Sequence, residues 1–214
     1  MSGELTGYKR KIKDNVLDLL GCVKDWKKYH NLSISHLNNV AANKLDLISK
    51  KIICEDTEKF NTYSDTLKFH IDNLCETYEK MEEQNDKMQE IAKRLQALAP
   101  AFNLERSFRE DEEENLVFNN FTWDQYVSKV TTVAKMFSEE AKIKKEIITK
   151  ICHVDEQLEG LDYDGYKNII TAMQSAWRYE PCINEDDLEN AIRPMLMDCL
   201  NSKNQIKDAY DIEF

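Results

Sequence analysis

Glycine and proline are scarce in this sequence, which has 5 glycines and 3 prolines in 214 residues. Folds that contain sheets need these residues at many turns, and phosphate-binding and dinucleotide-binding loops are built from closely spaced glycines. The scarcity therefore disfavours β-rich and α/β folds and favours long uninterrupted helices. The length suits one domain, or one compact body with an elongated arm. We predict an all-α protein.

Long hydrophobic runs are also missing. A membrane-spanning helix needs about 18 or more consecutive apolar residues, and no stretch of this sequence approaches that length. The first residues are polar where a signal peptide would be apolar. The 40 acidic residues outnumber the 29 basic ones, giving a net charge of -11, so counterion release would oppose binding to nucleic acid. We expect a soluble intracellular chain with no direct nucleic-acid partner and no membrane contact.

Motifs of catalytic or metal-binding chemistry are absent from the sequence. The cysteines have no Cys-x-x-Cys spacing, and there is no His-Glu-x-x-His helix, glycine-rich phosphate loop or nucleophile elbow. Cys152 and His153 are adjacent, but consecutive helical residues point about 100° apart and do not converge on one ion. A pair of catalytic carboxylates needs a cleft that shifts the two pKa values apart. The carboxylates of this sequence are expected on exposed helix faces or in an acidic run, which provide no such cleft. We predict no enzymatic activity, no catalytic residue, no cofactor and no metal.

The pattern that is present is a repeat of apolar residues at alternating spacings of four and three. It begins near residues 9–14 and continues to His30, slips in phase around residues 31–35, and resumes as far as Ile52. A helix break capped by Ser33 and a continuous helix with a local stutter both explain the slip. Either way, the pattern predicts helix with one apolar face.

The longest heptad pattern covers residues 57–99 and predicts a coiled-coil rod. Its seam is apolar or small at all but two positions, Ser64 and Asn85. About 40 residues at 1.5 Å per residue make a helix near 60 Å long, which a small globule cannot bury. Asn85 either fixes the register with a facing helix or lies at the solvent edge of the seam. Pro100 should end this helix, because its ring clashes with the preceding turn.

A linker and a third long helix are predicted next. The acidic run at residues 109–114 repels itself and cannot pack, so we expect residues 100–121 to be an acidic flexible linker. Thr122 and Gln125 form a capping-box pattern at the start of the following helix. Its apolar stripe continues until Gly160, which should supply the stop.

Two short helices should follow. One ends before Pro181, and the last is capped by Asn184 and kinked at Pro194. The predicted fold is an elongated antiparallel helical bundle or coiled coil of three long helices plus two short C-terminal helices. Residues 1–99 would form the N-terminal helices with the rod, and residues 122–214 a helical segment that packs on them.

Candidate partner-binding residues come from three features. Tryptophans near helix ends suit an interface because they bury a large area around one polar atom, although packing in the chain's own core is the alternative. The rod's seam should exceed what the first and third helices cover, which leaves room for a partner helix. A basic cluster would suit an acidic partner or nuclear import, or be a solvated helix face. These residues are Trp26, Trp123 and Trp177; Leu74, Met81 and Asn85; and Arg10, Lys11 and Lys13.

Several of these residues together resemble the cyclin-dependent kinase 2-interacting protein family. In chain order, the similar positions are residues 10–15, Trp26, residues 38–43, residues 121–123, Met136, Phe137, Glu140, Lys144, Lys145, His153, Trp177 and Pro181. The last pair resembles a C-terminal Trp and Pro of the family and adds Pro181 to the candidate partner-binding residues. The resemblance covers most of the chain except the long rod and the linker.

The resemblance implies a small adaptor of the cell cycle without enzymatic activity. It would stand beside another small helical subunit in a AAA ATPase assembly concerned with ribosome maturation and replisome clearance. Links to DNA replication through a cyclin-dependent kinase, and to the DNA damage checkpoint through the ATR-interacting protein, are implied as well. Localisation would be nuclear, with a cytoplasmic share left open. A heteromer is favoured over a homo-oligomer.

Departures from the family pattern weaken the role of a kinase substrate. No serine or threonine is followed by proline, as proline-directed phosphorylation requires, and no arginine has a leucine two positions later, as a cyclin-docking motif requires. The sequence also does not show the family's basic, proline-containing N-terminal extension. We therefore favour a subunit of the assembly. The alternative is a structural coiled-coil subunit of a kinetochore or tethering complex, and the proteins that co-purify would distinguish the two.

Overall fold

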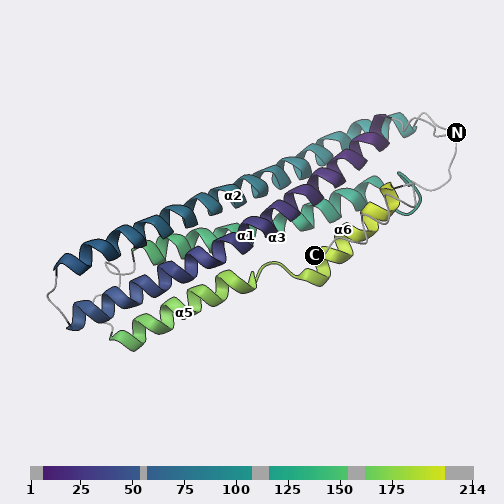
Figure 1. Cartoon of the computed structure of the whole chain (residues 1–214). Helices are drawn as coiled ribbons and strands as arrows, with labels where there is room; N and C mark the ends of the chain where they lie inside the picture. The colour runs from purple at the N-terminus through teal and green to yellow at the C-terminus, as the bar shows by residue number, and fades with distance from the viewer. Residues whose placement is uncertain (1–6, 54–56, 108–115, 154–161, 201–214) are drawn as a thin grey trace. The chain divides into compact units, whose positions relative to one another are not determined.

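The structure is a computed structural model of the chain, and it describes residues 7–53, 57–107, 116–153 and 162–200. These residues form five α-helices (Figure 1): α1 (Gly7–Ile53), α2 (Thr57–Ser107), α3 (Trp123–Cys152), α5 (Tyr163–Tyr179) and α6 (Glu185–Cys199). They include no β-strand, only an isolated bridge between Leu116 and Thr122. The predicted all-α class is confirmed. In this part of the chain, no helix combines the length and apolar character that crossing a membrane requires.

α1 continues without a break through residues 31–35, where the sequence pattern slips in phase. Ser33 is not a helix cap but a fully buried helical residue, and its hydroxyl donates to the His30 carbonyl at 2.6 Å. A small side chain that is satisfied by its own helix lets the apolar face change phase without leaving an unpaired polar group. Of the two interpretations of the slip, the structure supports the continuous helix.

The prediction that Pro100 ends the rod was wrong. Pro100 lies inside α2, which continues to Ser107, so the first residues of the predicted linker are helical. Proline lacks the N–H that would bond to the Gln96 carbonyl. Both residues are exposed, so water can satisfy this carbonyl. Beyond Pro100, the ring of Phe102 stacks on Trp123 with centroids 4.7 Å apart, which gives the end of α2 a packing partner.

The predicted capping box at the start of α3 is confirmed. The backbone N–H of Thr122 donates to Gln125 Oε1 at 2.8 Å, and the N–H of Gln125 donates to Thr122 Oγ1 at 3.3 Å. These bonds satisfy donors that a helix N-terminus otherwise leaves free. α3 extends to Cys152, whereas the predicted stop at Gly160 and the acidic run 109–114 lie outside the described residues.

Asp198 of α6 organises the turn that precedes α3. Its Oδ1 accepts from the backbone N–H groups of Asn119 and Asn120, both at 3.0 Å, and from the side chain of Asn120 at 2.9 Å. Its Oδ2 accepts from the hydroxyl of Tyr126 at 2.7 Å. The carboxylate is buried, and these four donors replace the water that it loses.

Two shorter helices follow α3. α5 ends at Tyr179, before Pro181, and the side chain of Asn184 caps α6 by accepting from two backbone N–H groups of its first turn. Pro194 lies inside α6. The predicted kink at this proline stays a prediction.

The chain divides into two compact units. The first unit comprises residues 1–25, 84–138 and 183–214, and the second unit comprises residues 26–83 and 139–182. α1, α2 and α3 each contribute one part to each unit, while α6 belongs to the first and α5 to the second. Each unit is therefore built from helical segments that lie far apart in the sequence.

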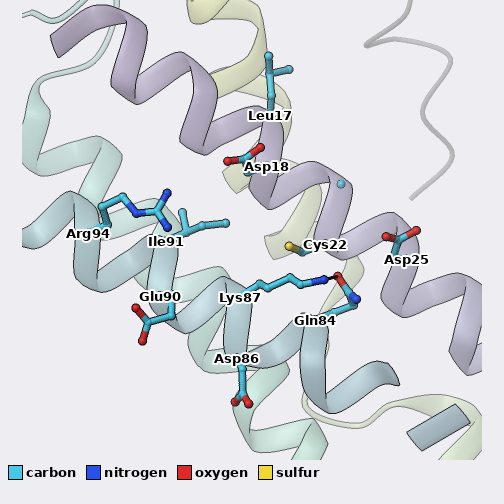
Figure 2. Close-up of a pocket in the computed structure, with 11 residues that line it drawn as sticks. Leu17, Asp18, Cys22, Asp25, Gln84, Asp86, Lys87, Glu90, Ile91 and Arg94 are labelled. Atoms are coloured by element: carbon cyan, nitrogen blue, oxygen red, sulfur yellow. Dashed lines mark hydrogen bonds between the residues drawn. The ribbon is translucent and has the colours of Figure 1, made fainter. Parts of the chain in front are cut away.

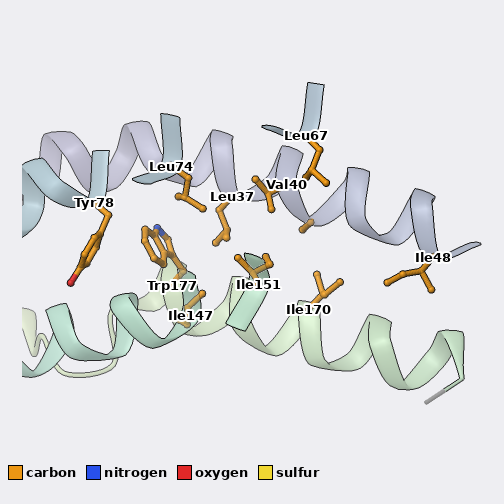
Figure 3. Close-up of a cluster of buried hydrophobic side chains, with 11 residues drawn as sticks. Leu37, Val40, Ile48, Leu67, Leu74, Tyr78, Ile147, Ile151, Ile170 and Trp177 are labelled. Carbon is orange, nitrogen blue, oxygen red and sulfur yellow. The ribbon is translucent and has the colours of Figure 1, made fainter. Parts of the chain in front are cut away.

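Apolar side chains from α1, α2, α3 and α5 fill the core of the second unit, as Figure 3 shows. Burial of one Leu or Ile side chain in such a core stabilises the folded chain by roughly 1.5–3 kcal/mol. The core comprises Leu37, Val40, Ala41, Ile48, Leu67, Leu74, Tyr78, Ile147, Ile151, Ile170 and Trp177. The first unit has its own core of the same kind, which includes Ile12, Val16, Leu19, Met88, Leu95, Val130, Leu188 and Ile192.

The seam of α2 is buried within the chain from Leu67 to Leu95, with only Ile71 half-buried among the seam positions of this stretch. Asn85 is buried too and is not at the solvent edge. Its Oδ1 accepts from Gln89 at 3.4 Å, and Gln89 also donates to a backbone carbonyl of α3 at 2.7 Å. Over this stretch the rod pairs with helices of its own chain, and the surplus seam that was expected for a partner helix is not found there.

Candidate functional site

The second unit contains a network of buried polar side chains around Lys144 of α3. Lys144 is fully buried, and its ammonium group lies 3.4 Å from Glu140 Oε1 and 3.4 Å from Glu180 Oε1. It donates to the carbonyl of Trp177 at 3.0 Å and lies 4.6 Å from the centre of that ring. It also contacts Nδ1 of His30 at 3.1 Å. Anions, carbonyl and aromatic face together replace the water that a lysine normally keeps.

The same network ties α1 to the end of α5. Trp26 donates its indole N–H to Glu180 Oε1 at 2.8 Å, and Trp177 donates its indole N–H to Ser33 Oγ at 2.9 Å. Glu180 is the C-cap of α5 and, among the described residues, the non-glycine residue with a positive φ, 44°. Such a conformation costs about 1–3 kcal/mol. The bonds to its carboxylate hold Glu180 in this conformation.

Glu140 extends the network to the turn after α5. Its Oε2 accepts from the backbone N–H of Cys182 at 3.1 Å. Its Oε1 has the ion pair with Lys144 as a contact but no well-formed hydrogen bond. Glu140 is fully buried, so this ion pair is what compensates the charge on Oε1.

Burial shifts the pKa values of these groups. Desolvation, followed by the charge of Lys144, lowers the pKa of His30 to about 3. His30 is therefore neutral at pH 7, its Nδ1 accepts from Lys144, and its 3.6 Å approach to Glu180 is not an ion pair. Desolvation also lowers the pKa of Lys144 and raises the pKa of Glu140, and the opposite charges beside each group only partly counteract it.

The network is closed to solvent. Lys144 and Glu140 are both 0% exposed, so no substrate can reach them. Buried polar groups of this kind fix how helices pack, because any other arrangement would leave a charge without its partner. In the described residues, no group of three or more His, Cys, Asp and Glu side chains is placed to hold a metal ion. The network is therefore best interpreted as a device that sets the packing of α1, α3 and α5.

An open groove lies between α1 and α2 in the first unit (Figure 2). Its volume is ≈ 560 Å³. The buried side chains of Cys22, Gln84 and Ile91 form its floor. The other lining residues are exposed: Leu17, Asp18, Gly21, Asp25, Asp86, Lys87, Glu90 and Arg94.

Carboxylates outnumber basic groups around this groove by four to two. These charges affect the pKa of the Cys22 thiol. Burial raises its pKa, the charge of Lys87 counteracts this, and the charges of Asp18 and Asp25 add to it. Cys22 is therefore protonated at pH 7 and is not an activated nucleophile. The groove is suited to recognition by shape and charge.

Most of the predicted partner-binding residues lie in the chain's own core. The three tryptophans pack in the core of the chain, which was the alternative to an interface role. The indole N–H of Trp123, for example, donates to the carbonyl of Leu95 at 3.2 Å. Buried in this way are Trp26, Leu74, Met81, Asn85, Trp123 and Trp177. These side chains hold the chain together in this structure and are not available at its surface.

The other predicted residues are accessible. Arg10 and Lys11 are exposed near the start of α1, Lys13 is half-buried, and Pro181 is exposed. Arg10 lies 3.7 Å from Asp14 in an exposed ion pair, and such pairs contribute little to stability. The basic residues therefore share consecutive turns of one helix, where they remain available to an acidic partner.

Neither the buried network nor the groove was predicted from the sequence. A partial signal existed for the network, since Glu140 and Lys144 are spaced to pair along one helix face, as are Trp26 and His30. No pattern marked Glu180, because its role depends on a C-cap conformation. No pattern marked the groove, because Gly21 in its lining interrupts neither the helix nor its apolar stripe.

Comparison with known proteins gives one match along nearly the whole chain. No protein-family model matches. The cyclin-dependent kinase 2-interacting protein of Xenopus laevis is 22% identical over 200 residues, which cover 91% of this chain and 90% of that protein. The chain is thus similar, over almost its full length, to a protein named for interaction with a kinase. This agrees with the resemblance noted from residues and spacing.

Proposed function

We propose that this chain is a non-catalytic helical adaptor that binds other proteins, and that a cyclin-dependent kinase is among its partners. The observation that carries the proposal is the match over 91% of the chain to a protein named for interaction with cyclin-dependent kinase 2. The all-helical fold and the open groove in the first unit are in keeping with a binding role. The polar network in the second unit serves packing.

The proposal extends to the setting that the sequence resemblance implies. The adaptor would be one subunit of a AAA ATPase assembly in ribosome maturation and replisome clearance, beside a second small helical subunit, with links to checkpoint signalling. The kinase would be a binding partner, and the absence of proline after any serine or threonine argues against proline-directed phosphorylation of the chain.

Affinity purification of the tagged chain, followed by mass spectrometry, tests this function. We expect a cyclin-dependent kinase and AAA ATPase subunits to be enriched, and direct binding of the purified chain to the purified kinase to be measurable. Lys144→Met, which should destabilise the fold, tests whether recovery of the partners depends on the folded chain. Recovery of kinetochore or tethering subunits, without kinase or ATPase, would refute the proposal in favour of a structural coiled-coil role.

Nuclear localisation is part of the same proposal. It is supported by the family resemblance and by the basic residues Lys9, Arg10, Lys11 and Lys13 on the first turns of α1. Imaging of the tagged chain with these four residues changed to serine should show reduced nuclear signal. An unchanged signal would remove these residues as the import signal, and a wholly cytoplasmic wild-type chain would contradict the assignment.

A further inference from the structure

Gly21 is an exposed residue in the interior of α1 that lines the groove of the first unit. Glycine at such a position costs about 1 kcal/mol of helix stability relative to alanine. The usual reason to keep it is the close approach of another segment. Here a Cβ added at Gly21 would meet no heavy atom within 4 Å. The packing of the chain thus gives no reason for glycine, and its missing side chain keeps the groove open.

Two carboxylates flank Gly21 on the α1 side of the groove. Asp18 precedes it by three residues and Asp25 follows it by four, so the two aspartates are about 10 Å apart along the helix. Figure 2 shows both projecting from α1 on the lining of the groove. Both are exposed, and neither has a hydrogen bond or ion pair with a described residue. Their charges are available to a partner.

The floor beneath these carboxylates is apolar at Cys22 and Ile91, while Gln84 adds a polar amide whose Oε1 accepts from Lys87 at 3.5 Å. Ile91 is 3% exposed and Cys22 is 7% exposed, and Leu17 adds an exposed apolar side chain to the lining. On the α2 side, Figure 2 shows Asp86 and Glu90 turned away from α1, and the basic side chains of Lys87 and Arg94 complete the lining. The α1 side of the groove, where Asp18 and Asp25 lie beside Cys22 and Ile91, is therefore complementary to an apolar side chain with basic neighbours.

We propose that this groove binds one amphipathic helix of a partner protein. The helix would seat a large apolar side chain over Gly21 and against Ile91. Lysines or arginines three and four residues to either side would reach Asp18 and Asp25, because a helix lying alongside α1 has the same rise per residue. The net charge of -11 favours the approach of such a basic segment. This inference rests on the proposed function, because it presupposes that the chain binds proteins.

A synthetic peptide of about 15–20 residues, long enough to form helix, is the probe for this site. It carries Leu at the centre, Lys at the two flanking positions, and alanine and glutamine elsewhere, with a fluorescent label for anisotropy. Its control has the same composition in scrambled order, so that Leu and Lys do not share one face. We expect the patterned peptide to bind the full chain at least about tenfold more tightly than the scrambled one.

Gly21→Leu and Gly21→Ala form a matched pair of variants of the full chain. Both remove the glycine and suit a helix, but only Leu fills the groove. We expect Gly21→Leu to weaken binding of the patterned peptide about tenfold or more and Gly21→Ala to change it by less than about threefold. Asp18→Asn with Asp25→Asn should weaken binding and reduce its dependence on salt.

A second readout locates the bound peptide. Alkylation of Cys22 on the groove floor, followed by mass spectrometry, should be suppressed by the patterned peptide. Alkylation of Cys182, a half-buried thiol of the second unit, should not change. Equal binding of patterned and scrambled peptides, or full binding by Gly21→Leu, would overturn the groove assignment. Kinase and ATPase recovery that is equal for wild type and Gly21→Leu would also overturn it while leaving the proposed function intact.

Discussion

Lys144 shows how strongly one residue can depend on its surroundings in this chain. With Lys144 replaced by Met, the carboxylates of Glu140 and Glu180 would lose the cation that lies 3.4 Å from each of them. Removing one partner of a buried ion pair is destabilising by roughly 3–5 kcal/mol, because the remaining charge stays buried. We expect Lys144→Met to lower the midpoint of urea unfolding, followed by circular dichroism. The free energy of unfolding taken from this curve should fall by roughly 3–5 kcal/mol.

The next residue along the chain provides the control for this change. Lys145 is 65% exposed and pairs with Glu82, which is 39% exposed. Such surface pairs contribute about 1 kcal/mol or less. Lys145→Met should therefore leave the unfolding midpoint nearly unchanged. Equal effects of the two substitutions would contradict the role given to the buried network.

His30 should make stability depend on pH. Its pKa in the folded chain is about 3, below its ordinary value of 6.5, so between these values the unfolded state binds more protons. The stability that depends on neutral His30 is complete above about pH 6.5 and is lost as the pH falls toward 3. Protonation would remove the acceptor for Lys144 and place a second cation 3.1 Å from it, while Glu180 offers only partial compensation.

Replacement of His30 by Gln isolates this effect, because glutamine stays neutral and can still accept from Lys144. The free energy of unfolding of the wild type minus that of His30→Gln should be constant above about pH 7. It should fall by up to about 1.4 kcal/mol per pH unit below pH 6.5. Glu140, whose pKa is raised, acts in the opposite sense, but the subtraction removes its contribution. A difference that does not change with pH would contradict the assignment.

At the scale of the helices, α2 was predicted as a continuous apolar seam, and Leu74 is its sharpest test. Leu74 is 0% exposed. An aspartate there would put an unpaired carboxylate into the core, at a cost of roughly 4 kcal/mol or more. We expect Leu74→Asp to lose most of the helical circular dichroism of the isolated chain. Glu83→Asp, at an exposed position off the seam, is the control and should keep the circular dichroism of the wild type. Wild-type circular dichroism of Leu74→Asp would instead indicate that the seam is an unoccupied partner interface.

Local signals predicted the helices well where the residues involved interact with their near neighbours. The capping box of Thr122 and Gln125 and the cap at Asn184 depend on residues two or three positions away, and both form. Pro100 was misjudged because its effect depends on exposure. A helix can pass a proline where water reaches the freed carbonyl and where a later side chain, here Phe102, has a packing partner. Whether that carbonyl is exposed to water cannot be predicted from the neighbouring residues alone.

The arrangement within each unit could not be predicted from periodicity. Periodicity shows which face of a helix is apolar, but not which other helix covers it. Trp26 bonds to Glu180, and Trp177 bonds to Ser33, over 154 and 144 residues of sequence. The tryptophans were predicted as anchors for a partner because each was expected near a helix end, whereas Trp26 lies in the interior of α1. Only the fold shows that their polar atoms are satisfied within the chain.

Because both units draw on the two halves of the chain, neither half should fold alone. Residues 1–107 supply α1 and α2 to each unit, and residues 116–214 supply α3, α5 and α6. Without α3, the apolar seam of α2 would lose its partner over several turns, for example where the Tyr78 hydroxyl donates to the Ala141 carbonyl at 3.2 Å. We expect each fragment, expressed separately, to show no cooperative thermal transition, since helices in water depend on packing of their apolar faces.

Co-expression of the two fragments tests this expectation directly. The pair should co-elute in size-exclusion chromatography as one helical complex with a cooperative thermal transition, because the two fragments retain every contact among the described residues. The same pair carrying Leu74→Asp should not assemble, which separates specific packing from aggregation. Fragment 1–107 melting cooperatively by itself, at the temperature of the full chain, would show that its helices are stable without the C-terminal half.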